Sequence, residues 1–113
     1  MSECNMWGGG LIMYLINTAR GVGKTHSLIM DSVKTGATII EPTSIQAKII
    51  EERASLMGVK IPKPISAYDI VSGNQRGRHN IDYLVDEFPQ VMTILLGGQM
   101  IGATSSITII DIV

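Results

Sequence analysis

Residues 17–27 read NTARGVGKTHS, and they follow the unbroken apolar run of residues 11–16. Such a run is typical of a strand that is buried on both faces. Gly21 and Gly23 permit a tight turn, and Lys24 opens a segment in which apolar residues recur at helical spacing. The sequence therefore predicts a strand, a glycine-rich turn and a helix in direct succession.

A turn of this kind is suited to binding phosphate. Its backbone N–H groups converge on phosphate oxygens at the N-terminus of the helix that follows. Lys24 would reach the β and γ phosphates as a point charge, and Thr25 would offer a hydroxyl to Mg²⁺. The predicted cofactors are thus ATP and Mg²⁺, and the positions expected to bind nucleotide here are Arg20, Gly21, Val22, Gly23, Lys24, Thr25 and His26.

Three positions of this segment have alternative interpretations. Arg20 would lie along the triphosphate as a built-in arginine finger, or it would be solvated together with Lys24. Thr18 stands where the full pattern has glycine, and threonine cannot take every backbone conformation that glycine can. His26 would contact nucleotide or have a metal or catalytic role, or it would be a packed or half-exposed side chain.

Residues 81–88, IDYLVDEF, supply the expected partner of this loop. Tyr83, Leu84 and Val85 form a short apolar run of strand type that ends in two acids. Asp86 is placed to hold the magnesium ion, and Glu87 to orient and deprotonate an attacking water. The predicted catalytic residues are Lys24, Glu87 and Arg20. The structural alternative is that two acids end a strand because carboxylates favour water.

Residues 99–106, QMIGATSS, form a third element, in which an apolar stretch runs into hydroxyl residues. P-loop ATPases with a catalytic glutamate often end their next core strand in a polar residue that senses the γ-phosphate. The candidates for this role are Thr104, which we include among the nucleotide-binding residues, Ser105 and Ser106. An ordinary Ser/Thr turn is the alternative.

Periodicity and caps predict three helices. Residues 24–35 would present Leu28, Ile29 and Val33 to the core, and Gly36 would cap the helix. Residues 44–57 would form a helix with a capping box at Thr43 and Gln46. Its core-facing residues would be Ile45, Ile49, Ala54 and Leu56 or Met57. A short helix would begin at Pro89 and end near Leu96.

The expected strands cover residues 11–16, 37–40, 64–68, 83–85, 100–104 and 107–112. Strands that alternate with helices predict an α/β fold, here a three-layer P-loop NTPase with a mainly parallel central sheet flanked by helices. Ligands of such sheets bind at the carboxyl ends of the strands. The loop before Lys24, the pair Asp86–Glu87 and Thr104 all lie at predicted strand ends, which favours one composite site.

These motifs resemble those of viral DNA-packaging ATPases, the large terminase or DNA-encapsidation proteins of tailed phages. The run ARGVGKTHS is similar to their P-loop, which often carries an arginine inside the turn, and RGRHNIDYLVDEF is similar to their strand that ends in Asp-Glu. The resemblance implies that Asp86 binds magnesium, that Glu87 activates water and that the region of Thr104 couples hydrolysis to movement. It also implies DNA as a partner and assembly into a homo-oligomeric ring or a larger viral or host assembly. Helicase-like ATPases share this layout.

Composition sets further limits. With 113 residues, 45% of them hydrophobic, the chain suits a single minimal domain over residues 1–113, with residues 1–10 as a lead-in. The net charge of −1 gives no bulk positive field for nucleic acid. Cys4 is the lone cysteine, which suits a reducing cytoplasm, that of the host if the protein is viral. No secretory signal or membrane span is expected.

Three functions remain open at this level. The first is ATP hydrolysis by in-line attack of water, of the DNA-packaging or helicase-like type. The second is a catalytically weak or inactive binding protein that modulates a viral or host ATPase or another partner, which Thr18 and the small size favour. The third is a small-molecule kinase. Arg76 and Arg78 would reach a neighbouring subunit's phosphate or DNA, or would be solvated loop charges.

Overall fold

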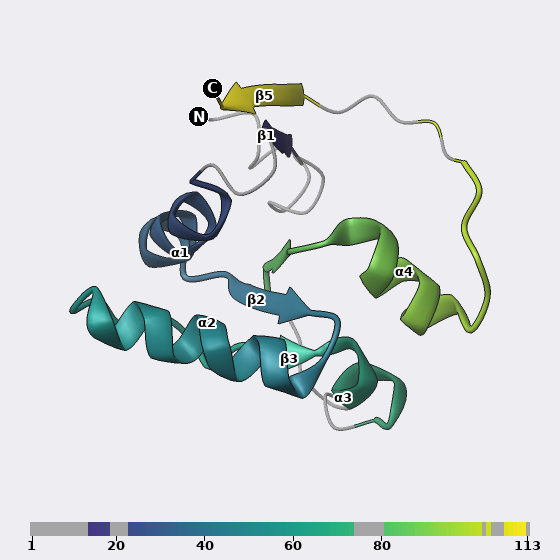
Figure 1. The fold of residues 1–113 in the computed structure, drawn as a ribbon, viewed down its shortest axis with the longest axis horizontal. Helices are drawn as coiled ribbons and strands as arrows, with labels where there is room; N and C mark the ends of the chain where they lie inside the picture. The colour runs from purple at the N-terminus through teal and green to yellow at the C-terminus, as the bar shows by residue number, and fades with distance from the viewer. Residues whose placement is uncertain (1–13, 19–22, 74–80, 103, 105–107, 113) are drawn as a thin grey trace. The chain divides into compact units, whose positions relative to one another are not determined.

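The computed structural model describes residues 14–18, 23–73, 81–102, 104 and 108–112. Its elements alternate between strand and helix for most of the chain (Figure 1). In order they are β1 (Tyr14–Thr18), α1 (Lys24–Thr35), β2 (Thr38–Glu41), α2 (Ser44–Leu56), β3 (Ile65–Ser66), α3 (Ala67–Val71), β4 (Tyr83–Val85), α4 (Phe88–Leu96) and β5 (Thr108–Ile112).

The chain divides into two compact units. One comprises residues 1–24 and 102–113, and the other residues 25–101. In the first unit β1 and β5 form a parallel pair, with Tyr14 opposite Thr108 and Thr18 opposite Ile112. In the second unit three parallel strands form a sheet in the order β3-β2-β4. The expected α/β class with parallel strands is therefore confirmed.

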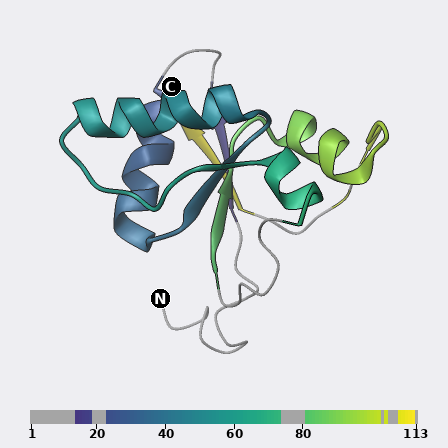
Figure 2. The same cartoon turned by 90° about the horizontal axis from the view of Figure 1, so that it is seen from below.

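The central strand of the second unit is buried on both faces. Side chains alternate across a strand, so Ile39 and Ile40 point to opposite faces. Ile39 packs in a cluster with residues of α1 and α2, whereas Ile40 packs with residues of α3 and α4. Figure 2 shows the two helix pairs on opposite sides of β2. Apolar burial on both faces of β2 holds this unit together.

Helix α1 has the predicted bounds, but its buried face differs by one residue. Leu28 and Ile29 are buried as expected, whereas Val33 is 40% exposed and Ser32 is 1% exposed. Ser32 can occupy the interior because its hydroxyl donates a 2.7 Å hydrogen bond to the carbonyl of Ala37. The prediction that Val33 faces the core is wrong, because this bond and the turn after α1 place Ser32 inside instead.

Gly36 ends α1 as predicted. It has a φ of +75°, and its N–H donates to the carbonyl of Ser32. A Cβ at this position would meet no atom within 4 Å, so only the backbone conformation opposes a side chain. We expect Gly36→Ala to lower the free energy of unfolding by about 1 kcal/mol. Gly98→Ala is the control, since Gly98 also has open space and lacks a left-handed φ. Urea unfolding of both variants measures the difference, and equal costs would contradict the strain.

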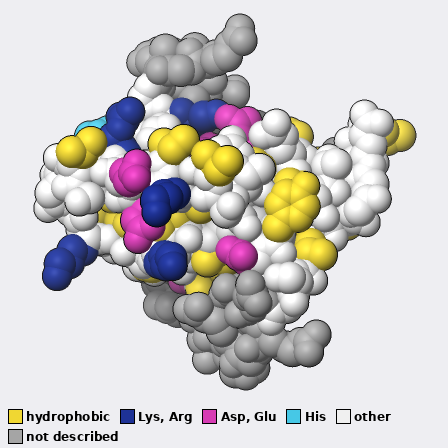
Figure 3. All heavy atoms as spheres, turned by 60° about the horizontal axis from the view of Figure 1, so that its bottom comes forward, with side chains coloured by type: hydrophobic (Ala, Val, Ile, Leu, Met, Phe, Trp, Pro, Cys, Tyr) yellow, Lys and Arg dark blue, Asp and Glu magenta, His cyan; other side chains and the backbone are white. Residues whose placement is uncertain are grey.

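Helix α2 begins at its predicted cap but buries a different face. The Thr43 hydroxyl oxygen accepts a hydrogen bond from the Gln46 N–H at 3.3 Å, and the hydroxyl donates to the Gln46 side-chain oxygen at 2.9 Å. The buried residues are Ala47, Ile50 and Ala54. Ile45 and Ile49 are 73% and 54% exposed, so the prediction that they face the core is wrong, whereas Ala54 is buried as predicted. Of the two alternatives Leu56 and Met57, Leu56 is 86% exposed and Met57 packs against the core. Figure 3 shows hydrophobic side chains interspersed with charges of both signs on the surface.

Four predicted strands need correction. Strand β1 was expected over residues 11–16, but it continues to Thr18. Strand β2 includes Glu41, which was expected to follow it. Residues 67 and 68 belong to α3 rather than to a strand, because Ser66 and Asp69 form a reciprocal capping box that starts a helix. The strand expected over 100–104 is absent at the described residues 100–102 and 104. There the side chain of Ile101 is 93% exposed and takes no part in the core.

Candidate functional site

The acidic pair lies where the sequence predicts it. Strand β4 ends at Val85, Asp86 and Glu87 follow, and α4 begins at Phe88 with proline in its first turn. The Asp86 N–H donates a 3.0 Å hydrogen bond to the carbonyl of Ile40 in β2, which continues the parallel pairing and fixes the Asp86 backbone. Asp86 is 9% exposed. The pair therefore lies at the carboxyl end of the sheet, where ligands of parallel sheets bind.

Glu87 has an unusual backbone conformation. Its φ and ψ are 55° and 57°, in the left-handed region, and it is the one non-glycine residue with positive φ among those that the structure describes. An L-residue there costs about 1–2 kcal/mol. Glu87 is also the N-cap of α4, yet its side chain makes no capping hydrogen bond. Strained residues of this kind cluster at active sites and switch regions, so the conformation marks Glu87 as a candidate functional residue.

The predicted loop residues divide into two sets. Gly23 has a φ of +67° directly before α1, as a glycine-rich turn requires. Lys24, Thr25 and His26 lie together in the first turn of α1, where Lys24 and Thr25 are partly buried and His26 is exposed. Arg20, Gly21 and Val22 lie outside the described residues, as do Arg76 and Arg78 in the loop before β4.

Thr18 is the last residue of β1 and pairs with Ile112. Extended backbone is favoured by β-branched residues, so threonine fits this position without strain. The departure from the full glycine pattern thus falls at a residue whose conformation does not call for glycine.

Thr104 does not end a strand. It is exposed and precedes β5, which begins at Thr108. Because Thr108 pairs with Tyr14, at the start of β1, Thr104 precedes the amino end of this parallel pair. The glycine-rich loop follows Thr18, at the opposite end. The expectation that Thr104 ends a strand is therefore wrong, whereas β5 corresponds to the strand expected over 107–112. Ser105 and Ser106 lie outside the described residues.

Two acids at strand ends were missed in the sequence. Glu41, the last residue of β2, is 1% exposed and lies beside Ser66 in the register. Ile40 pairs with Val85, so Glu41 and Asp86 directly follow a pair of opposed residues in adjacent strands. Asp111 is opposite Asn17 near the carboxyl end of β5. The signal was an acid after apolar residues, which is the pattern that identified Asp86.

Searches for a metal centre and a membrane span found neither in the part of the chain that the structure describes. Within it, no three His, Cys, Asp or Glu side chains are grouped to hold a metal ion. No helix there is both long and apolar enough to cross a bilayer. Comparisons with protein-family models, curated proteins and solved structures found no match to the chain.

Proposed function

We propose that this protein binds ATP through a P-loop at residues 17–27 and hydrolyses it with Glu87 as the general base. The observation that carries the proposal is the acidic pair at the carboxyl end of a parallel strand, with Glu87 in a left-handed conformation. The order of strand β1, Gly23 and helix α1 supports it, because a loop between such elements would direct backbone N–H groups toward a phosphate. The fold would then be the three-layer P-loop NTPase type.

The donor atoms present fit magnesium. Mg²⁺ prefers oxygen ligands and is usually held by one or two carboxylates together with waters and substrate phosphates, so a large protein cage is not required. Thr25 would contribute its hydroxyl and Asp86 its carboxylate. When bound, the ion would neutralise charge on the β and γ phosphate oxygens.

Each protein group has a distinct role in the reaction. Water attacks the γ-phosphorus in line as the bond to the β–γ bridging oxygen breaks, which yields ADP and phosphate. Glu87 accepts the proton that the water loses. Lys24 binds the β and γ phosphates as a fixed positive charge, and Arg20 stabilises charge on the transferred group.

The biological setting that we propose follows the motif order of the DNA-packaging and helicase-like ATPases. Hydrolysis would drive movement or remodelling of DNA in the cytoplasm, by a homo-oligomeric ring or a larger viral or host assembly. A net charge of −1 gives this chain no strong overall positive field. We therefore expect its DNA contacts to be weak and sensitive to salt.

Steady-state ATP turnover by the purified protein with Mg²⁺, with and without DNA, tests the assignment. Lys24→Ala removes the charge on the phosphates, and we expect turnover to fall about 100-fold or more. Lys34→Ala is the matched control, because Lys34 is an exposed lysine in the last turn of the same helix. Equal turnover by the wild type and Lys24→Ala would remove Lys24 from the site.

A binding protein without turnover is the second candidate. The specific observation in its favour is the exposed apolar set Ile45, Ile49 and Leu56 on α2, a surface that a partner protein would cover. Tight binding of ATP with Mg²⁺ in calorimetry and measurable hydrolysis would both count against this function.

A further inference from the structure

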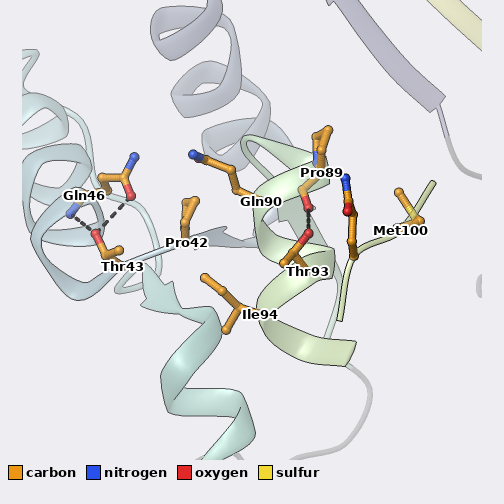
Figure 4. Close-up of a pocket in the computed structure, with 9 residues that line it drawn as sticks. Pro42, Thr43, Gln46, Pro89, Gln90, Thr93, Ile94 and Met100 are labelled. Carbon is orange, nitrogen blue, oxygen red and sulfur yellow. Dashed lines mark hydrogen bonds between the residues drawn. The ribbon is translucent and has the colours of Figure 1, made fainter. Parts of the chain in front are cut away.

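A pocket of about 410 Å³ opens between α2 and α4, within the unit of residues 25–101 (Figure 4). Its walls come from the residues that follow β2, the first turns of α4 and the segment around Met100. The volume lies in the range of small-molecule sites, about 300–1,000 Å³. Since β2 and β4 are adjacent parallel strands, the residues that follow them lie at the carboxyl edge of the sheet.

Among the described residues that line this pocket, none has a charged side chain. Three glutamine amides, Gln46, Gln90 and Gln99, provide hydrogen-bond donors and acceptors, and prolines, Ile94 and Met100 provide apolar surface. A phosphate, a carboxylate or an ammonium group would gain no ion pair from these described residues. The lining therefore suits an uncharged chemical group that has both apolar faces and polar edges.

Two hydrogen bonds orient the lining. The Thr43 hydroxyl donates to the Gln46 side-chain oxygen at 2.9 Å, which holds the Gln46 amide in place and keeps its NH₂ group available as a donor. The Thr93 hydroxyl donates to the Pro89 carbonyl at 2.9 Å. Figure 4 shows Gln46 and Gln90 reaching toward one another from α2 and α4. The Gln46 amide is thus held on the α2 side of the pocket, and the Gln90 amide lies on the α4 side.

We propose that this pocket binds a nucleobase. A base has two apolar faces, which suit the prolines, Ile94 and Met100, and an edge of donors and acceptors, which glutamine amides read. A peptide would more commonly pair its backbone with an exposed sheet edge, whereas this pocket is lined by side chains of α2, α4 and their flanking residues. The base belongs to a free nucleoside or nucleotide, or to an unpaired strand. The site does not depend on ATP hydrolysis.

The test is a titration of the full-length protein with adenosine, followed by NMR of the glutamine side-chain amides. We expect saturable shifts with a Kd below about 1 mM, and none with ribose alone. Gln90→Leu should weaken adenosine binding about tenfold, because it removes the amide while keeping similar bulk. Gln46→Leu is a second variant with the same expectation. If loss of the hydrogen bond between the Gln46 and Thr43 side chains destabilises α2, the result for Gln90→Leu decides the test.

Two controls make the result specific. Ser55→Leu places the same side chain at an exposed position of α2 outside the pocket and should leave binding unchanged. Lys24→Ala should also leave it unchanged, so failure of the ATPase assignment and failure of the nucleobase site are distinguishable. Absence of saturable shifts up to the solubility limit of adenosine would overturn the proposal. Binding that is equal in Gln90→Leu and wild type would overturn it too.

A single-stranded hexadeoxyadenylate identifies the source of the base. Tighter binding than adenosine, with the same loss in Gln90→Leu, would support the site and assign it to an unpaired strand. Binding equal to or weaker than that of adenosine, again sensitive to Gln90→Leu, would support the site and assign it to a free nucleoside or nucleotide. Binding of an uncharged peptide in the pocket, with no response to either base probe, would overturn the nucleobase assignment.

Discussion

Glu87→Gly is expected to abolish ATP turnover while leaving the protein at least as stable as the wild type. Loss of a general base lowers the rate by about 10²–10⁴-fold. Removal of the Cβ relieves the left-handed strain at φ 55°, worth about 1–2 kcal/mol. The greater freedom of glycine in the unfolded chain offsets part of this gain. We therefore expect the free energy of unfolding to stay constant or to rise by up to about 1 kcal/mol.

The matched control is Glu52→Gly, which removes an exposed carboxylate from the interior of α2. There glycine should cost about 1 kcal/mol of stability, and turnover should be unchanged. The two variants thus give opposite results in both assays, steady-state turnover and urea unfolding. Glu87→Asn is a further variant, since asparagine tolerates left-handed backbone but cannot accept the proton from water. Wild-type turnover in Glu87→Gly would exclude Glu87 as the base, and a large loss of stability would show that its role is structural.

Only those parts of the candidate site that depend on short sequence patterns could be predicted. Asp86 and Glu87 were placed correctly because an apolar strand followed by acids is a pattern within a few residues. The same pattern is present at Glu41, which directly follows Ile39 and Ile40, and it was overlooked. The left-handed conformation of Glu87 has no signal in the sequence, because glycine or asparagine would be expected at such a backbone position.

Helix boundaries were predictable for a similar reason. The cap at Thr43, the glycine after α1 and the proline that opens α4 each act within one turn of the helix that they start or end. Which face of a helix is buried depends on contacts that are distant in sequence. Helix α2 carries apolar residues on two faces, so periodicity alone did not show which face packs on Ile39.

Ile50→Ala and Ile49→Ala are expected to differ strongly in stability, although the residues are adjacent and identical. Ile50 is 4% exposed and packs with Leu28, Ile29, Ile39 and Ala54. Its truncation removes apolar contacts and leaves a cavity, at a cost of about 2–5 kcal/mol. That is a large share of the roughly 5–15 kcal/mol that stabilises a typical domain.

Ile49 is 54% exposed, so its truncation should change the free energy of unfolding by less than about 0.5 kcal/mol. The higher helix propensity of alanine would offset some of the lost apolar contact. Urea unfolding followed by circular dichroism measures both variants, and Ile45→Ala should behave like Ile49→Ala because Ile45 is 73% exposed. Equal costs at positions 49 and 50 would mean that α2 is rotated from the orientation seen here. The distinct burial of neighbouring isoleucines then makes this pair a direct test of which face of α2 forms the core.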